Sequence, residues 1–177
     1  MDTAHALAAA RTHFTHRATA TAPTREDALA ALDALAAGGT HPLLARGTAD
    51  PDGRTAWMLT GQGSQRPGMG RELYAAHPVF ARAFDEAVRH LDPHLDHPLR
   101  EVVFCDPGTE RAALLDTTRY AQPALFALQT ALHALLTHHG AAPDVLIGHS
   151  VGELTAAHLA GVLDLPDAAR LVATRGG

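Results

Sequence analysis

The sequence predicts an α/β protein built on a parallel sheet, with a small α+β segment before it. Two apolar runs of strand length support the sheet, residues 55–60 and residues 144–148. Each run leads directly into a glycine-containing turn, and the second turn opens a helix-like segment. A long helical pattern lies between the two runs, over residues 120–139. We therefore expect two parts, residues 1–53 and residues 54–177.

Composition and charge favour a globular protein and argue against some classes of partner. The 177 residues are 46% hydrophobic, which suits a globular protein, and a net charge of −5 argues against a nucleic-acid surface. The single cysteine, Cys105, excludes an internal disulfide and is interpreted as a small buried side chain. The longest apolar segment, residues 123–136, is too short to span a bilayer, and the N-terminus shows no signal peptide. We expect a soluble cytoplasmic protein with no membrane partner.

The first part reads as a helix, a strand, a second helix and a linker. Residues 3–13 are helical and residues 16–22 have the alternation of a strand. Thr24 is a predicted N-cap, because acidic residues fill the following turn and favour the helix dipole. Apolar positions of this helix recur at spacing three, at Leu29, Leu32 and Leu35. Glycines at positions 38 and 39 end it, and residues 40–53 are interpreted as a linker.

A glycine-rich loop, Gly61-Gln62-Gly63-Ser64-Gln65, follows the first strand-like run. Such a loop places backbone N–H groups at the carboxyl edge of a parallel sheet, where ligands bind. It lacks the Gly-Lys-Ser/Thr of a P-loop, and Arg66 stands where a dinucleotide fingerprint needs its third glycine. Without other evidence the loop reads equally as a flexible turn.

Helical patterns fill the rest of the second part. Residues 77–92 are helical, a proline-bounded break follows at residues 93–98, and two short helical pieces reach residue 115. The long helix over residues 120–139 ends at Gly140. The last helix starts at residues 165–167 and runs to the final glycines.

The second strand-like run ends in Gly148-His149-Ser150-Val151-Gly152, which fits the G-x-S-x-G nucleophile elbow of an α/β-hydrolase-like sheet. This sharp strand-to-helix turn exposes the Ser150 hydroxyl, and its crowded backbone requires glycine at positions 148 and 152. The Val151 backbone N–H can then point at an oxyanion. The loop at residues 61–65 is the natural source of a second oxyanion donor. The alternative is an ordinary tight turn between a strand and a helix.

Thirteen histidines raise the questions of a metal and of a general base. The pairs His138-His139 and His94-x-x-His97 lack zinc-site spacing, so we expect no metal. His158 lies about two helical turns from Ser150, roughly 10 Å at 1.5 Å per residue, which is too far for a direct hydrogen bond. No other histidine follows Ser150, so the pattern supplies a nucleophile and an oxyanion hole without a base.

Four sequence blocks in order resemble the acyltransferase domain of a modular type I polyketide synthase. These blocks are Gly61–Gln65 with Gly68-Met69-Gly70, then Ala121-Gln122-Pro123-Ala124-Leu125, then Gly148–Glu153, and finally Arg175-Gly176. The same blocks occur in the related malonyl-CoA:acyl carrier protein transacylases, and they cover residues 55–177. Residues 1–50 are similar to the linker between ketosynthase and acyltransferase domains.

The resemblance implies a role for each matching residue. Ser150 would hold the acyl group as an ester, and Gln62 and Val151 would provide the oxyanion-hole N–H groups. Gln122 and His149 would line the substrate site, and Arg175 would pair with the malonyl carboxylate. A guanidinium suits that pairing because it stays charged and binds a carboxylate in bidentate fashion. Without the resemblance, Arg175 would read as a solvated cation near a helix C-terminus.

The resemblance also implies that the sheet is incomplete. The family's catalytic histidine and its ferredoxin-like subdomain would lie beyond residue 177, so the chain matches the N-terminal half of an acyltransferase. The expected substrate is an acyl-CoA, with malonyl-CoA favoured by Val151 and the residues before Pro123. The expected partners are a phosphopantetheinylated acyl carrier protein, an adjoining ketosynthase and the C-terminal half, with no bound cofactor. An esterase-like hydrolase and a non-catalytic docking piece of a split synthase are the alternatives.

Overall fold

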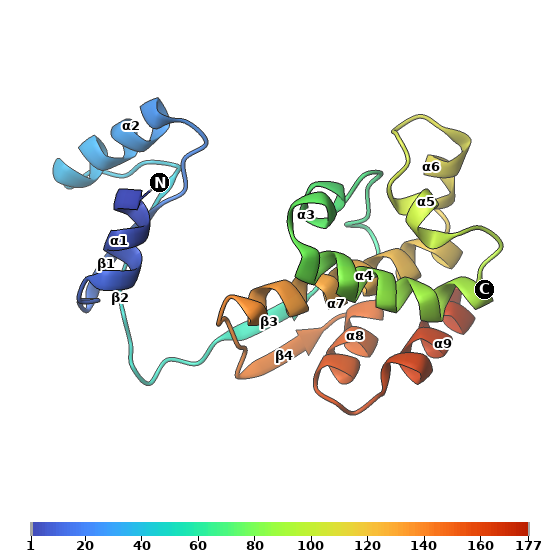
Figure 1. The fold of residues 1–177 in the computed structure, drawn as a ribbon. Helices are drawn as coiled ribbons and strands as arrows, with labels where there is room; N and C mark the ends of the chain where they lie inside the picture. The colour runs from blue at the N-terminus through green and yellow to red at the C-terminus, as the bar shows by residue number, and fades with distance from the viewer. Residues whose placement is uncertain (1, 177) are drawn as a thin grey trace. The chain divides into compact units, whose positions relative to one another are not determined.

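The computed structural model describes residues 2–176 and has a mixed α/β fold with two small sheets (Figure 1). One sheet is an antiparallel pair and the other is a parallel pair. The chain divides after Gly53 into two compact units, and each is described by itself.

The first unit contains two helices and the antiparallel strand pair. Its elements are α1 (Asp2–Ala10), β1 (His16–Ala20), α2 (Arg25–Ala36) and β2 (Leu44–Thr48). The predicted N-cap of α2 is confirmed, because Thr24 Oγ1 accepts a hydrogen bond of 3.1 Å from the Asp27 N–H. Leu29 and Leu32, however, are 51% and 52% exposed, so their regular spacing does not mark a buried face in this unit.

The interpretation of residues 40–53 as a linker is wrong, because β2 lies within them. β2 pairs with β1 from His16 opposite Thr48 to Ala20 opposite Leu44. The burial pattern of β2 leaves all but Leu44 exposed, so β2 has no buried face that an alternation of apolar and polar residues could mark. The strand exists through backbone pairing with a partner far along the chain, and local patterns do not report such pairing.

The second unit contains the parallel pair and the remaining helices. Its elements are β3 (Ala56–Leu59), α3 (Arg71–Ala76), α4 (Pro78–Leu91), the short 3₁₀ helix η1 (Asp92–His94), α5 (Leu99–Val103), α6 (Glu110–Leu114), α7 (Thr118–His138), β4 (Val145–Gly148), α8 (Val151–Leu159) and α9 (Leu165–Gly176). The predicted helices before and after residues 93–98 and the long helix before Gly140 are confirmed, whereas α3 was not predicted. Gly140 has a φ of 83°, the left-handed conformation that ends a helix at glycine.

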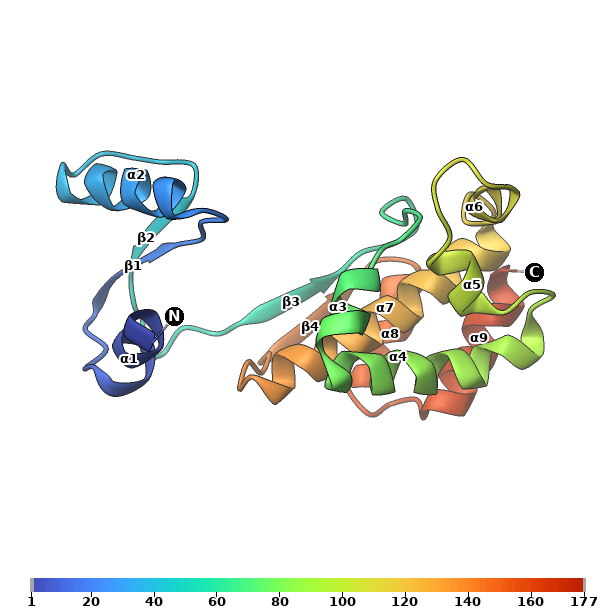
Figure 2. The same cartoon turned by 45° about the horizontal axis from the view of Figure 1, so that its top comes forward.

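The core of the second unit lies between α4, α7 and α9. Helices α4 and α7 lie side by side (Figure 2). From α4, Phe80, Phe84 and Leu91 are completely buried, as its helical apolar spacing predicts. Phe126 of α7 is equally buried, so the helices rather than the sheet supply most of this core.

The parallel pair has one covered face and one open face. Register aligns Trp57 with Leu146 and Met58 with Ile147. Because side chains alternate along a strand, each aligned pair shares a face. Trp57 and Leu146 are partly buried, whereas Met58 is 80% and Ile147 52% exposed.

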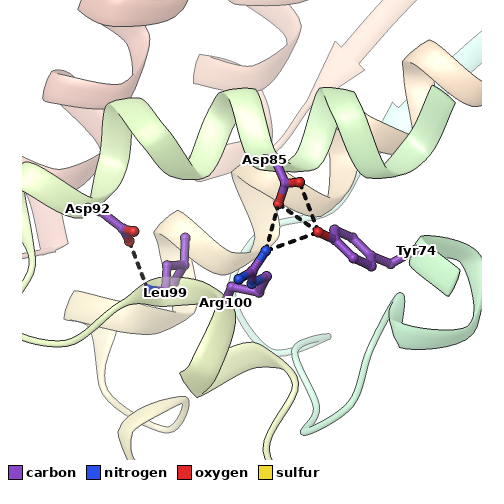
Figure 3. A network of polar contacts seen from close by, with 5 residues as sticks. All are labelled: Tyr74, Asp85, Asp92, Leu99 and Arg100. Atoms are coloured by element: carbon purple, nitrogen blue, oxygen red, sulfur yellow. Dashed lines mark hydrogen bonds and ion pairs between the residues drawn. The ribbon is translucent and has the colours of Figure 1, made fainter. Parts of the chain in front are cut away.

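A polar network on the surface joins three helices of the second unit (Figure 3). The Tyr74 hydroxyl of α3 donates to the Asp85 carboxylate of α4 at 2.8 Å. Arg100 of α5 donates to the Tyr74 oxygen at 3.0 Å and lies 3.4 Å from Asp85. Asp92 accepts the Leu99 N–H at 2.8 Å, which satisfies a backbone donor at the start of α5. These contacts link α3 and α5 to α4.

The helices between residues 2 and 176 include none with the length and apolar character needed to cross a membrane.

Candidate active site

The turn between β4 and α8 holds Ser150 in a strained backbone conformation. Ser150 has φ 56° and ψ −117°, and within residues 2–176 it is the one non-glycine residue with a positive φ. Such a conformation costs on the order of 1–3 kcal/mol and persists where packing imposes it. This geometry, at the end of a strand and directly before a helix, is that of a nucleophile elbow.

Two glycines permit this turn because the backbone packs too closely for side chains. A Cβ at Gly148 would lie 2.2 Å from the Gly152 carbonyl carbon. A Cβ at Gly152 would lie 2.2 Å from the Leu59 carbonyl oxygen, at the end of the neighbouring strand. The first turn of α8 therefore lies directly on the C-terminal end of β3. The prediction that the crowded turn requires glycine at positions 148 and 152 is confirmed.

The glycine-rich loop after β3 lies against the elbow. A Cβ at Gly61 would come within 2.6 Å of His149 Nδ1 and 3.4 Å of the Ser150 Cβ. The His149 N–H donates to the Leu59 carbonyl at 3.2 Å, which extends the parallel pairing one residue beyond β4. The two loops predicted to carry the site are thus adjacent at the carboxyl edge of the parallel pair.

Arg175 contacts the hydroxyl of Ser150. Its Nη2 donates a hydrogen bond to Ser150 Oγ at 3.0 Å. Arg175 comes from the last turn of α9, and that end of the helix is held close to the start of α7. A Cβ at Gly176 would lie 2.9 Å from the Thr118 carbonyl oxygen. Among residues 2–176, Ser150 Oγ has no hydrogen-bond partner except Arg175.

Two glutamines connect the glycine-rich loop to α7. Gln122 is 5% exposed, and its Nε2 donates to Gln62 Oε1 at 3.4 Å. The Gln62 Nε2 in turn reaches Thr118 Oγ1 at 3.5 Å. The Gln122 Oε1 is buried with no partner in the described residues. Val151 is fully buried as the first residue of α8, a position whose N–H has no intrahelical acceptor.

The structure brings no described histidine into hydrogen-bond contact with Ser150. The His158 Nδ1 lies 3.1 Å from the Leu163 carbonyl oxygen, and its ring lies 5.6 Å from that of Phe126. His149 packs against Gly61. Within residues 2–176 there is also no group of three or more His, Cys, Asp or Glu side chains that could hold a metal.

Sequence reasoning missed the polar contacts of Gln129. This side chain of α7 is 7% exposed and donates from Nε2 to the Thr60 carbonyl at 2.9 Å. The one available signal was a glutamine within an apolar helix face, since a buried amide needs a partner. The partner itself could not be deduced, because Thr60 lies far from Gln129 in the sequence, directly after β3.

Similarity to known proteins identifies the fold to which this site belongs. Residues 56–177 match the family of acyl transferase domains. The chain belongs to this family. The acyltransferase chain is 54% identical over 175 residues to the spectinabilin polyketide synthase system protein NorB of Streptomyces orinoci. That match covers 99% of the chain and 8% of NorB.

Two solved acyltransferase structures are similar to this chain in sequence and in fold. The acyltransferase domain from the second module of the salinomycin polyketide synthase is 51% identical, with a TM-score of 0.76. The match covers 99% of this chain and 40% of that one. A malonyl-transacylase solved in complex with its type II acyl carrier protein is 38% identical, with a TM-score of 0.60 over 70% of this chain and 38% of that one. The chain is thus part of an acyltransferase domain of the modular type I polyketide synthase kind, related to malonyl-CoA:acyl carrier protein transacylases.

Proposed function

We propose that this acyltransferase chain carries a malonyl-type acyl group from acyl-CoA to an acyl carrier protein. Ser150 Oγ attacks the thioester carbonyl, coenzyme A leaves as its thiol, and the acyl group remains as a serine ester. The phosphopantetheine thiol of the carrier protein then attacks that ester and restores the hydroxyl. The solved malonyl-transacylase with its carrier protein supports this substrate and this partner. The reaction needs no bound cofactor.

The contact between Arg175 and Ser150 carries the proposal. A guanidinium 3.0 Å from the nucleophile is placed to bind a second carboxylate on the acyl group. Malonyl has that carboxylate and acetyl does not, so Arg175 selects carboxylated donors. An esterase-like hydrolase has no such requirement, which makes acyl transfer from a carboxylated donor the better explanation.

The remaining residues take supporting roles in this proposal. Backbone N–H groups of Gln62 and Val151 stabilise the oxyanion, as their loops meet at the elbow. Gln122 and His149 line the acyl site. The parallel pair belongs to a larger α/β-hydrolase-like sheet, which a C-terminal half completes within a cytoplasmic synthase that also carries a ketosynthase. Residues 1–53 form the linker-like part beside that ketosynthase.

The chain by itself does not turn over in this proposal, because the Ser150 hydroxyl has no base among its described partners. The same observation supports the second candidate, a non-catalytic docking piece of a split synthase. The two differ in whether Ser150 becomes acylated once a C-terminal half is supplied.

The test compares malonyl and acetyl loading in the chain extended by the C-terminal half of a related acyltransferase domain. Arg175→Ala is expected to lower kcat/KM for malonyl-CoA at least roughly tenfold more than for acetyl-CoA. Removing one partner of a charge-assisted pair costs about 2–5 kcal/mol, and 1.36 kcal/mol corresponds to about tenfold in rate.

Ser150→Ala is the control and must abolish loading from both donors. Equal slowing of both donors by Arg175→Ala would make the arginine structural and remove the basis for a carboxylated substrate. Absence of any Ser150-dependent loading in the extended protein would favour the docking piece.

A further inference from the structure

Gln129 is a buried amide in the middle of α7. It is 7% exposed, and its neighbours on the helix, Leu125 and Phe126, belong to the apolar core. Burying an amide without hydrogen bonds costs on the order of 1–3 kcal/mol in proteins. An apolar side chain could be buried here at a lower free-energy cost. The hydrogen bonds of Gln129 therefore explain why a glutamine occupies this position.

Those contacts end on the residue that precedes the glycine-rich loop. Gln129 Nε2 donates to the Thr60 carbonyl oxygen at 2.9 Å and to Thr60 Oγ1 at 3.2 Å. The Thr60 hydroxyl is also 2.9 Å from the Ser64 hydroxyl, on the far side of the loop. A continuous series of hydrogen bonds therefore joins α7 to both ends of residues 60–64.

Thr60 also touches the elbow. A Cβ at Gly152 would lie 2.8 Å from the Thr60 carbonyl oxygen, so the first turn of α8 packs directly on this peptide group. The preceding carbonyl, that of Leu59, accepts the His149 N–H at 3.2 Å. The position of the Thr60 peptide thus sets the spacing between the loop that carries Gln62 and the turn that carries Ser150.

We propose that Gln129 is a positioning residue that holds the two oxyanion-donor loops at their working distance. The proposal rests on the proposed acyl transfer, and Gln129 acts through Thr60 rather than on the substrate. Its Oε1 has no partner among the described residues, so the donor side of the amide alone makes the contact. An oxyanion hole works only when its donors are already aligned, because the interaction is made in the transition state.

Hydrogen–deuterium exchange on the 177-residue chain tests the holding role. Gln129→Met keeps the size of the side chain and removes the donor. The amides of Gly63 and His149, which are hydrogen-bonded in the structure, are expected to exchange faster, while amides of α4 remain unchanged. Thr130→Val is the matched control on the same helix, because Thr130 is buried and its hydroxyl has no partner in the described residues.

Acylation by p-nitrophenyl acetate, in the chain extended by the C-terminal half of a related acyltransferase domain, tests the consequence for chemistry. The activated ester reports attack by Ser150, with Ser150→Ala as the blank. Gln129→Met is expected to lower the acylation rate constant roughly tenfold with an unchanged apparent dissociation constant for the ester, because only transition-state contacts are lost. Thr60→Val should have a smaller effect, and Thr60→Ser, which retains the hydroxyl, should restore the rate.

Two outcomes overturn the proposal for Gln129, and a third bears on the proposed function. Unchanged exchange at Gly63 and His149 in Gln129→Met overturns the proposal. Faster exchange with an unaltered acylation rate makes Gln129 structural only and equally overturns it. If the extended protein shows no acylation above the Ser150→Ala blank, this counts against the proposed function, and exchange then still decides whether Gln129 holds the loop.

Discussion

Among single residues, His133 couples the fold to pH. It lies on α7 with its ring 5.4 Å from that of Trp57, edge to face, below the covered side of the parallel pair. Partial burial lowers the pKa of His133 below its usual value, and the nearby His158 lowers that pKa further. The folded protein therefore favours the neutral imidazole more strongly than the unfolded chain does.

The lowered pKa of His133 sets the direction in which pH changes the stability of the fold. Below the unfolded pKa, about 6.5 for a histidine, the unfolded chain binds a proton that the folded protein resists. The free energy of unfolding should thus fall as pH drops through about 6.5 toward the lower folded value. Urea unfolding at several pH values measures it, and His133→Gln should flatten this part of the profile. A profile that the substitution leaves unaltered would assign the pH effect to other groups.

Among elements, the junction of β3, β4 and α8 shows which features follow from the local sequence, which from the family resemblance and which only from the packed structure. The apolar run, the glycines and the serine predicted a strand, a turn and a helix, and the structure has them in that order. A place for Arg175 at the substrate site was expected from a family resemblance alone, and its direct contact with Ser150 was not predicted, since no spacing rule brings α9 to the elbow. The contact between Gln129 and Thr60 was not predicted, because it depends on how α7 packs on β3. Local chemistry is readable from sequence, whereas contacts between distant elements require the packed fold.

The junction makes a prediction about Gly152. Gly152→Ala should destabilise the fold by about 3 kcal/mol or more, because backbone atoms of β3 occupy the space and cannot move as a flexible side chain can. In the chain extended by a C-terminal half, the same substitution should also remove Ser150-dependent acylation. Thermal unfolding and p-nitrophenyl acetate measure the two effects. Gly47→Ala is the control, since a Cβ there meets nothing within 4 Å. Similar melting temperatures for the two variants would contradict the packing argument.

In the second unit as a whole, an apolar surface lies open to solvent. Met58 and Ile147 pair across the open sheet face and are 80% and 52% exposed. A groove of about 600 Å³ runs along the β3 edge, lined by Trp57, Leu128 and Leu132 among others. Exposed strand edges and contiguous apolar patches favour association with other chains.

We therefore expect the isolated chain to self-associate. Sedimentation velocity should show a concentration-dependent increase in mass, and Met58→Thr with Ile147→Thr should weaken association roughly tenfold or more, since each buried side chain contributes about 1.5–3 kcal/mol. Leu171→Gln on α9 is the control, because that leucine is 44% exposed on a helix that packs mainly on α7, α4 and α8. A monomer at all concentrations with one sharp thermal transition would contradict this expectation.

The position of Arg175 also has a consequence for synthesis on the ribosome. Arg175, which contacts Ser150, lies near the end of α9. The other parts of the site come earlier in the chain, namely the loop at residues 61–65, Gln122 and Ser150. Translation proceeds from the N-terminus at roughly 5–20 residues per second. The nascent chain thus presents Ser150 for a short interval before Arg175 emerges, so in the proposed function the carboxylate-binding side chain is the last of these parts to be assembled.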